Sequence, residues 1–169
     1  SGETTAPEVL IEVDFDIDEN EMEGNGSYNC EHVVPQSWFN KQNPQRGDLH
    51  HLFACTPNCN SFRGNIPYVE FPDWEEKIMD NCGKRETEGF EPKPAKGIVA
   101  PATLNFMLRY PQVNVPYNGI AFNSILAWHL EEPPTIYEYH RNAAIEELQG
   151  NRNPFIDCPK LATKLNFRK

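Results

Sequence analysis

The stretch from Pro35 to Pro67 constrains the fold most, because it lacks the long apolar runs that extended helices or buried strands need. It is rich in Asn, Pro, Gly and polar residues, and its apolar pieces are as short as Leu49 to Ala54. The sequence therefore predicts loops and short strands here. A loop stretch of this length within a folded domain usually carries function, so candidate functional residues are sought in it first.

Before this stretch, residues 9–18 alternate between apolar and acidic side chains, the period of two expected of a half-buried strand. A turn is expected at 23–27, followed by a short apolar segment at 28–34. The spacing of Asp14, Asp16 and Asp18 is also that of the start of a calcium loop, but the glycine and glutamate that complete such a loop are missing. We therefore interpret these acids as a solvated face.

Helical periodicity follows in the last third of the chain. A first helix is expected over residues 102–110, with Pro101 in its first turn. A second is expected over 120–130. The third begins at Thr135 with the capping box formed with Glu138 and ends at Gly150. Its apolar positions are Ile136, Tyr139, Ala143, Ala144 and Leu148. Strands early and helices late predict an α+β fold.

Two further segments carry less signal. Residues 72–97 contain three prolines and many charges, which predicts a surface excursion with Glu91 at the surface. The tract 151–155 is expected to close the fold, with a phosphate contact by Arg152 as the alternative.

The length of 169 residues fits one domain, and a hydrophobic content of 38% is enough for a packed interior. No apolar run approaches the roughly 20 residues that a bilayer span needs, so we expect no membrane contact. Residues 1–5 have neither the basic start nor the apolar stretch of a signal peptide, so we expect that any such peptide is absent from this chain.

Five cysteines exceed the usual content of a cytosolic domain of this size, which favours secretion. Cys55 and Cys59 lie four residues apart, within reach of a disulfide if the chain turns between them. The competing interpretation is a structural zinc site formed by these cysteines with His50 and His51. Because the count is odd, one thiol is left over, and we assign it to Cys158.

The net charge of −10 argues against simple nucleic-acid binding, since phosphate contacts need Lys and Arg. However, residues 1–31 contain ten of the 25 acidic residues and none of the 15 basic ones, so the rest of the chain is neutral. A neutral body can still engage a polyanion when a bound cation supplies positive charge.

Hydrolysis of a phosphodiester needs a base that activates water, a cation that stabilises the developing charge, and a donor for the nonbridging oxygens. Glu31 and His32, the run 46–52 and the run 60–65 together contain all three kinds of group. Carboxylate and amide oxygens suit Mg²⁺ or Ca²⁺ better than zinc.

Four stretches in the same order resemble the endonuclease I family of secreted and periplasmic nucleases, which belongs to the His-Me finger (ββα-metal) superfamily. They are YNCEHVVPQSWF (28–39), DLHHLF (48–53), NSFRGNIP (60–67) and QGNRNPFID (149–157). The resemblance implies a ββα-metal finger core in a single mixed α+β domain with C-terminal helices. Within that domain we expect an acidic strand and turn at 1–27, the finger region at 28–67, and a loop and helical remainder at 68–169.

The resemblance implies that His32 is the general base and that Glu31 and Asn60 bind the cation. Adjacent strand residues point to opposite faces, so Glu31 and His32 can serve one site only if the chain twists or bulges there. The Val33-Val34-Pro35 sequence that follows favours such an irregular strand end.

The resemblance also implies an arginine that steadies the cleaved phosphate. For this role we choose Arg46 ahead of Arg63. Asp48 and His51 are expected to hold in position the residues that contact the substrate or the cation, without contacting either themselves. Asp48 would do so by bonding either to the loop backbone or to His32. His50 and His51 are expected to alternate across a strand, so that at most one faces the site.

The resemblance thus implies a nuclease that acts on DNA, with RNA as a further substrate, and that has little sequence preference. Its expected cofactor is one divalent cation, Mg²⁺ ahead of Ca²⁺ or Mn²⁺. We expect a secreted or extracellular monomer, with the periplasm as the alternative location. Two other functions stay open: an inactive nucleic-acid-binding or surface module on the same fold, and a calcium-stabilised structural domain that uses the acids of residues 14–21.

Overall fold

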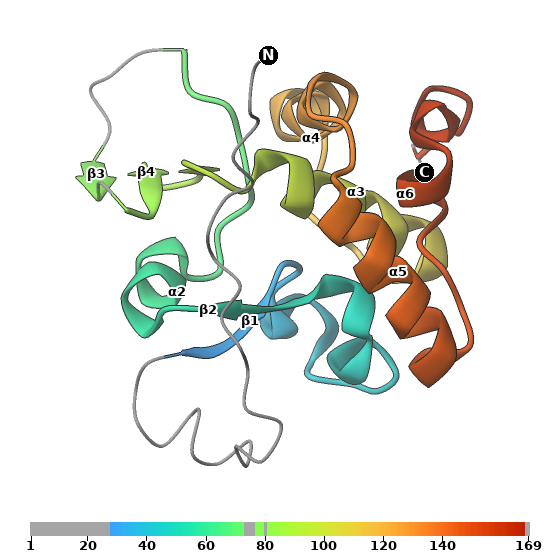
Figure 1. Cartoon of the computed structure of the whole chain (residues 1–169). Helices are drawn as coiled ribbons and strands as arrows, with labels where there is room; N and C mark the ends of the chain where they lie inside the picture. Colours follow the sequence, from blue (N-terminus) through green and yellow to red (C-terminus); the bar gives the residue numbers. More distant parts are fainter. Residues whose placement is uncertain (1–27, 73–76, 80, 168–169) are drawn as a thin grey trace, which may run out of the picture.

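The computed structural model describes residues 28–72, 77–79 and 81–167. The predicted strand at 9–18, the turn at 23–27 and the acids of the calcium hypothesis lie outside these residues. Helices α3 to α6 occupy one side of the molecule, and the two small sheets and α2 the other (Figure 1). The strands are β1 (Asn29–His32), β2 (Leu52–Cys55), β3 (Lys77–Met79), β4 (Gly83–Arg85) and β5 (Phe90–Pro92). The α-helices are α2 (Pro57–Arg63), α3 (Lys96–Arg109), α4 (Gly119–Glu131), α5 (Ile136–Gln149) and α6 (Pro154–Asp157). The 3₁₀ helices are η1 (Gln36–Phe39), η2 (Gln45–Gly47), η3 (Leu49–His51) and η4 (Pro159–Thr163).

Strands β1 and β2 form an antiparallel pair, and α2 follows β2 after Thr56. The long connection between the two strands, residues 33–51, contains η1, η2 and η3. The predicted α+β class is confirmed, and the stretch rich in Asn, Pro and Gly holds the second strand and the helix of a ββα unit built from short elements.

Within the segment 72–97, the prediction that Glu91 lies at the surface was wrong. Strands β3, β4 and β5 form an antiparallel sheet in that order, and Phe90, Glu91 and Pro92 are all buried. The Glu91 carboxylate forms ion pairs with Lys84 at 3.1 Å and Lys96 at 2.7 Å. It also accepts a hydrogen bond from the backbone N–H of Phe71. These partners offset the cost of burying the charge, and the sequence pattern did not reveal them.

Helix α3 is the central helix of the fold, with every residue from Val99 to Phe106 buried. A helix buried on all sides has apolar residues all round it. It begins at Lys96, so the prediction that Pro101 lies in the first turn was wrong. Pro101 lies in the second turn, and its carbonyl accepts a hydrogen bond from Nδ2 of Asn153, a residue of the carboxyl-terminal tract.

The predicted helices over 120–130 and after Thr135 correspond to α4 and α5. The capping box of Thr135 and Glu138 is present, and Gly150 ends α5 in the left-handed conformation. The predicted apolar face of α5 was wrong, because Ile136 is 89% and Leu148 79% exposed. The buried side chains are instead Glu138, Asn142 and Ile145. The two polar ones are tolerated because they form hydrogen bonds within the cap and to the tract 151–157.

Cys59 of α2 forms a disulfide with Cys82, the residue before β4. The predicted link between Cys55 and Cys59 was therefore wrong, because the pairing depends on how the second sheet packs. The Cys158 thiol is outside this disulfide, as expected, but so is that of Cys55. Over the part of the chain that the structure describes, no helix is long and apolar enough to cross a membrane.

The residues after β1 enter two different parts of the core. Val33 packs in a cluster with Phe62 of α2 and Leu104 of α3. Val34 packs in a second cluster with Phe39 and Phe106. Because consecutive side chains are buried on opposite sides, the backbone immediately after His32 is held from both sides.

Candidate active site

Strand β1 carries two of the candidate residues, Glu31 and His32. Its pairing with β2 is regular as far as His32, which lies opposite Leu52, and the chain bends at Val33 and Val34. The irregular end expected from Val33-Val34-Pro35 is therefore present just beyond the pair, and the alternation of faces persists within it.

The Glu31 carboxylate is buried against α2 and the segment that follows it. Its Oε1 lies 3.1 Å from Nη1 of Arg63 and accepts a hydrogen bond from the Tyr68 hydroxyl at 3.3 Å. Burial raises the pKa of Glu31 above its ordinary value, and the Arg63 charge and the Tyr68 hydroxyl oppose that rise. Both contacts use one carboxylate oxygen, so as far as the described residues go Oε2 is left for another partner.

Asn60 lies on α2 and reaches the same face of β1 as Glu31. Its Nδ2 donates to Oδ1 of Asn29 at 2.8 Å and to the carbonyl of Cys30 at 3.4 Å. Asn29 and Glu31 are two residues apart on one strand, so their side chains share a face. The amide nitrogen is engaged with β1, and within the described residues no hydrogen bond uses the amide oxygen.

Arg63 is buried, with only 3% of its surface exposed. Besides Glu31, it donates hydrogen bonds to the carbonyls of His32 at 3.2 Å and Val33 at 2.7 Å. Its guanidinium also lies over the Tyr68 ring, 4.6 Å from the centroid. Its donors are directed into the protein, and the side chain holds the end of β1 against α2.

His32 turns its ring away from this cluster, toward the 33–51 connection. Its Nε2 donates to the Arg46 carbonyl at 3.0 Å, and Nε2 must carry the proton because a carbonyl only accepts. Nδ1 is then the unprotonated nitrogen, and it accepts a hydrogen bond from Nε2 of Gln36 at 3.3 Å. Partial burial lowers the pKa of His32, as does the Arg46 charge, so the neutral imidazole is favoured.

His51 lies beside His32, and their ring centroids are 5.5 Å apart. It belongs to η3 and not to a strand, so both His50 and His51 are buried, contrary to the predicted alternation. Nε2 of His51 donates to the Gln45 carbonyl at 2.7 Å, one residue before the carbonyl that orients His32. Burial lowers the pKa of His51 to about 4, so this histidine is neutral at physiological pH.

Asp48 bonds to the loop backbone, one of the two alternatives predicted for it. It caps η3 by accepting from the His50 N–H at 3.1 Å, and it accepts from the Tyr110 hydroxyl and from Nε2 of Gln149, each at 2.8 Å. Burial by itself would raise the pKa of Asp48, but these hydrogen bonds more than offset it and the pKa is lowered. Gln149 also accepts from the Leu49 N–H at 2.9 Å, so α5 clamps the start of η3.

The competing zinc hypothesis was wrong. Cys59 is oxidised in its disulfide, and Nε2 of His50 bonds to the Asn151 carbonyl at 3.0 Å. Across residues 28–72, 77–79 and 81–167, no group of three or more His, Cys, Asp and Glu side chains is placed to hold a metal ion. A cation at Glu31 and Asn60 would thus have one carboxylate and one amide as its side-chain ligands.

The predicted residues therefore form two groups that meet at the end of β1. Glu31, Asn60 and Arg63 share one side, and the rings of His32 and His51 lie on the other, near the Arg46 backbone. The residues that contact them and that the sequence did not single out as site residues include Gln36, Tyr68 and Gln149. Gln36 and Gln149 lie in the quoted motifs, and only the tertiary contacts show what each one touches.

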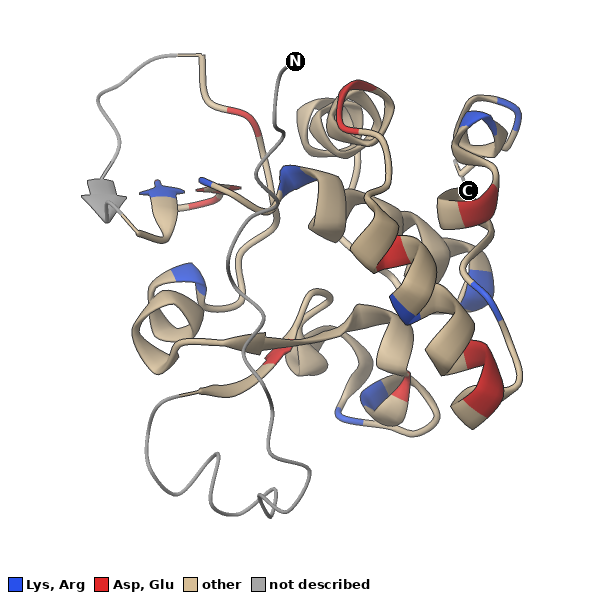
Figure 2. Cartoon of the chain, in the orientation of Figure 1, with Lys and Arg blue, Asp and Glu red and all other residues tan. Residues whose placement is uncertain are grey.

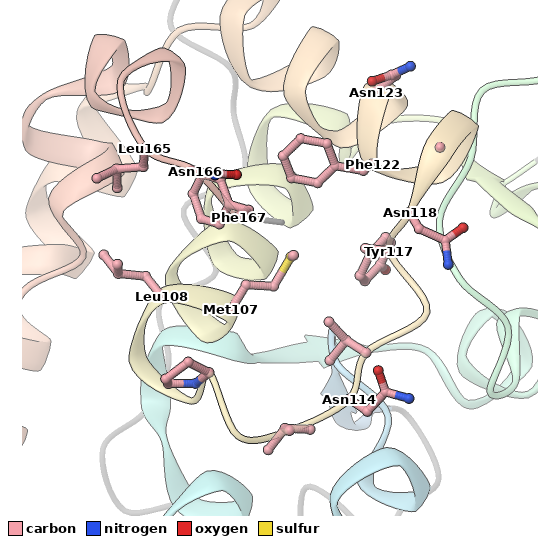
Figure 3. A pocket seen from close by; sticks show the side chains of 14 residues that line it. Met107, Leu108, Asn114, Tyr117, Asn118, Phe122, Asn123, Leu165, Asn166 and Phe167 are labelled. Carbon is pink, nitrogen blue, oxygen red and sulfur yellow. The ribbon is translucent and has the colours of Figure 1, made fainter. Parts of the chain in front are cut away.

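Basic residues do not form one continuous stretch in the described part of the chain, and Figure 2 shows them on several elements between acidic ones. A groove of about 650 Å³ lies between α3, α4 and the carboxyl-terminal segment, lined by residues such as Met107, Tyr117, Phe122 and Phe167 (Figure 3). None of the candidate residues lines it. The candidate site is instead at the carboxyl end of β1.

Comparison with known proteins gives a consistent family assignment. The model of the endonuclease I family matches residues 7–160. The chain is 30% identical over 163 residues to an extracellular ribonuclease of Bacillus amyloliquefaciens, covering 83% of this chain and 54% of that protein. It is 31% identical over 153 residues to a periplasmic deoxyribonuclease of Aeromonas hydrophila, covering 75% of this chain and 62% of that one. An extracellular deoxyribonuclease of the same organism is 30% identical over 153 residues, with 75% and 64% covered. The chain thus spans 54–64% of the length of these relatives.

Proposed function

Because this chain belongs to the endonuclease I family, we propose that it is a metal-dependent endonuclease that hydrolyses phosphodiester bonds with little sequence preference. Its relatives are named as ribonucleases and deoxyribonucleases, so DNA is the proposed substrate and RNA a further one. The observation that carries the proposal is the His32 imidazole, whose Nε2 donates to the Arg46 carbonyl, on the same strand end as the Glu31 carboxylate, whose contacts with described residues fall on Oε1.

The donor set at the end of β1 fits a hard divalent cation. Oε2 of Glu31 and Oδ1 of Asn60 are oxygen donors from the same side of the strand. Mg²⁺ is commonly held by one or two carboxylates together with water and substrate phosphate, so two side-chain ligands are enough. Mg²⁺ is therefore the proposed ion, with Mn²⁺ and Ca²⁺ as alternatives, and when bound it would supply positive charge to the phosphate in the transition state.

His32 acts as the general base in this proposal. A proton of the attacking water passes to Nδ1, and the water oxygen forms the new bond to phosphorus as the leaving oxygen departs with the electron pair of the broken bond. The Arg46 carbonyl fixes the tautomer that makes Nδ1 basic. Asp48 and His51 support this arrangement from η3, since His51 holds the carbonyl of Gln45 beside Arg46.

Arg46 is the proposed phosphate contact. The carbonyl of Arg46 is bonded to His32, and its side chain is exposed. The guanidinium is therefore carried by a residue that contacts the base, and it is accessible to solvent. Arg63, the second candidate, supports the site differently. With Glu31 and two carbonyls as partners, it orients the carboxylate instead of contacting phosphate.

Secretion and a monomeric state complete the proposal. The named relatives are extracellular or periplasmic, and a disulfide joins Cys59 and Cys82, which suits an oxidising compartment.

The test incubates purified protein with supercoiled plasmid, with Mg²⁺ or with EDTA. We expect cleavage only with metal, and a loss of roughly a hundredfold or more in His32→Ala, as for a removed general base. Asn60→Ala should also lose activity and need more Mg²⁺. Matched controls are His140→Ala and Asn58→Ala, which remove exposed residues of the same types and should cleave like the parent.

Failure has a defined meaning in this assay. If folded parent protein leaves plasmid intact with Mg²⁺, Mn²⁺ and Ca²⁺, the nuclease proposal is wrong. The inactive binding module then becomes the working hypothesis, and retention of plasmid in a gel-shift assay would support it. If His32→Ala cleaves as fast as the parent, the assignment of the base is wrong.

A further inference from the structure

Gln36 is the one side chain among the described residues that contacts the unprotonated nitrogen of His32. Its Nε2 lies 3.3 Å from Nδ1 of His32, and the other ring nitrogen is bonded to the Arg46 carbonyl. In the proposed mechanism this same Nδ1 receives the proton. The amide of Gln36 thus occupies the position from which water would be activated.

The packing of η1 fixes the root of the Gln36 side chain. Three residues further on, Phe39 is buried, with its ring centroid 5.6 Å from that of Phe106 and 6.1 Å from that of His51. Pro35, immediately before Gln36, is buried as well. The position of Gln36 next to His32 is therefore set by apolar contacts, and the amide at its tip is not needed to hold the backbone in place.

The contact between the amide and His32 is long enough to be exchanged for water. Hydrogen bonds from N–H groups are usually 2.7–3.2 Å, so a bond of 3.3 Å is a weak one. A water that replaces the amide at Nδ1 would remain within reach of the same carboxamide. A carboxamide both donates and accepts, so it can orient the second proton or a lone pair of that water.

We propose that Gln36 is a positioning residue that orients the attacking water against Nδ1 of His32. This inference rests on the proposed nuclease function and adds a residue to it. Holding a nucleophile in the reactive orientation lowers the entropic part of the barrier, and it acts on the chemical step more than on substrate binding. Loss of the amide should therefore lower kcat and leave KM almost unchanged.

The experiment measures kcat and KM for cleavage of a double-stranded oligonucleotide with Mg²⁺ by the parent and by Gln36→Met, which keeps the length of the side chain and removes its amide. One net hydrogen bond lost in the transition state predicts about a tenfold lower kcat, with KM within about twofold of the parent. Gln36→Ala, which adds no bulk, should behave in the same way. The matched control is Gln42→Met, an exposed glutamine of the same connection, which should cleave like the parent.

A second comparison separates positioning from a purely structural role. In a His32→Ala background, Gln36→Met should cause no further loss, because two residues that act on one water are not additive. The inference is overturned if Gln36→Met and Gln36→Ala match the parent. It is also overturned if Gln36→Met causes the same loss with and without His32, or raises KM in proportion to the loss of kcat. An inactive parent, in contrast, would refute the proposed function itself.

Discussion

Replacing Arg63 with Met removes the positive partner of a buried carboxylate. Arg63 and Glu31 are both buried, 3.1 Å apart, and the guanidinium also donates to the carbonyls of His32 and Val33. In Arg63→Met the carboxylate and both carbonyls lose a donor inside the protein. Removing one partner of a buried pair typically costs about 3–5 kcal/mol of unfolding free energy.

Thermal unfolding followed by circular dichroism measures this cost. For a protein of this size, 1 kcal/mol corresponds to roughly 2–4 °C in Tm, so the loss predicts a Tm lower by roughly 6–20 °C. Adding Glu31→Gln to Arg63→Met removes the uncompensated charge and should restore part of the lost Tm. If the two sites were independent, the decreases in Tm caused by the two substitutions would add.

The matched control is Arg152→Met. Arg152 contacts two carboxylates, those of Glu146 and Asp157, but the three side chains are 31–52% exposed and the pairs are screened by solvent. Its Tm should therefore stay close to that of the parent. If Arg63→Met is no less stable than Arg152→Met, or if Glu31→Gln lowers the Tm of Arg63→Met further, the assignment of Arg63 as the partner of a buried carboxylate is wrong.

Two further predictions concern the disulfide and the buried histidine. Reduction of Cys59–Cys82, which closes a loop with a sequence separation of 23, should lower the unfolding free energy by roughly 3 kcal/mol in urea melts; equal midpoints with and without dithiothreitol would contradict this. The pKa of His51 is lowered to about 4 from 6.5. The contribution of neutral His51 to the free energy of unfolding is therefore complete above pH 6.5 and is lost as the pH falls toward 4. Tm should drop over this range by less in His51→Gln, which keeps a donor for the Gln45 carbonyl, and equally steep curves for parent and variant would refute the role of His51.

Local signals in the sequence predicted the elements that depend on neighbouring residues. The capping box of Thr135 and Glu138 and the stop at Gly150 use backbone groups within one turn, and α5 has both. The packed face of α5 was predicted wrongly because a hydrophobic pattern cannot show that Asn142 is buried with hydrogen bonds to the tract 151–157. The same limit applies to the disulfide, since Cys82 meets Cys59 only through the packing of a second sheet.

The candidate site divides in the same way. The identities of Glu31, His32 and Asn60 came from motifs that lie close together in the chain. The environment of each residue is tertiary, however. The burial of Arg63 and the contact of Gln36 with His32 depend on how α2 and η1 pack, and that packing cannot be predicted from the motif alone.

The link between Asp48 and Gln149 joins residues 101 positions apart, at the start of η3 and the end of α5. A chain emerging from the ribosome therefore contains all of the proposed catalytic side chains long before it contains the clamp that fixes η3. Contacts of such long sequence separation form late, because the entropy lost in closing the intervening loop is offset only once the contact has formed. The 28–67 region made alone should thus lack an ordered η3, and a growing chain should acquire its complete site only after Gln149 has been synthesised.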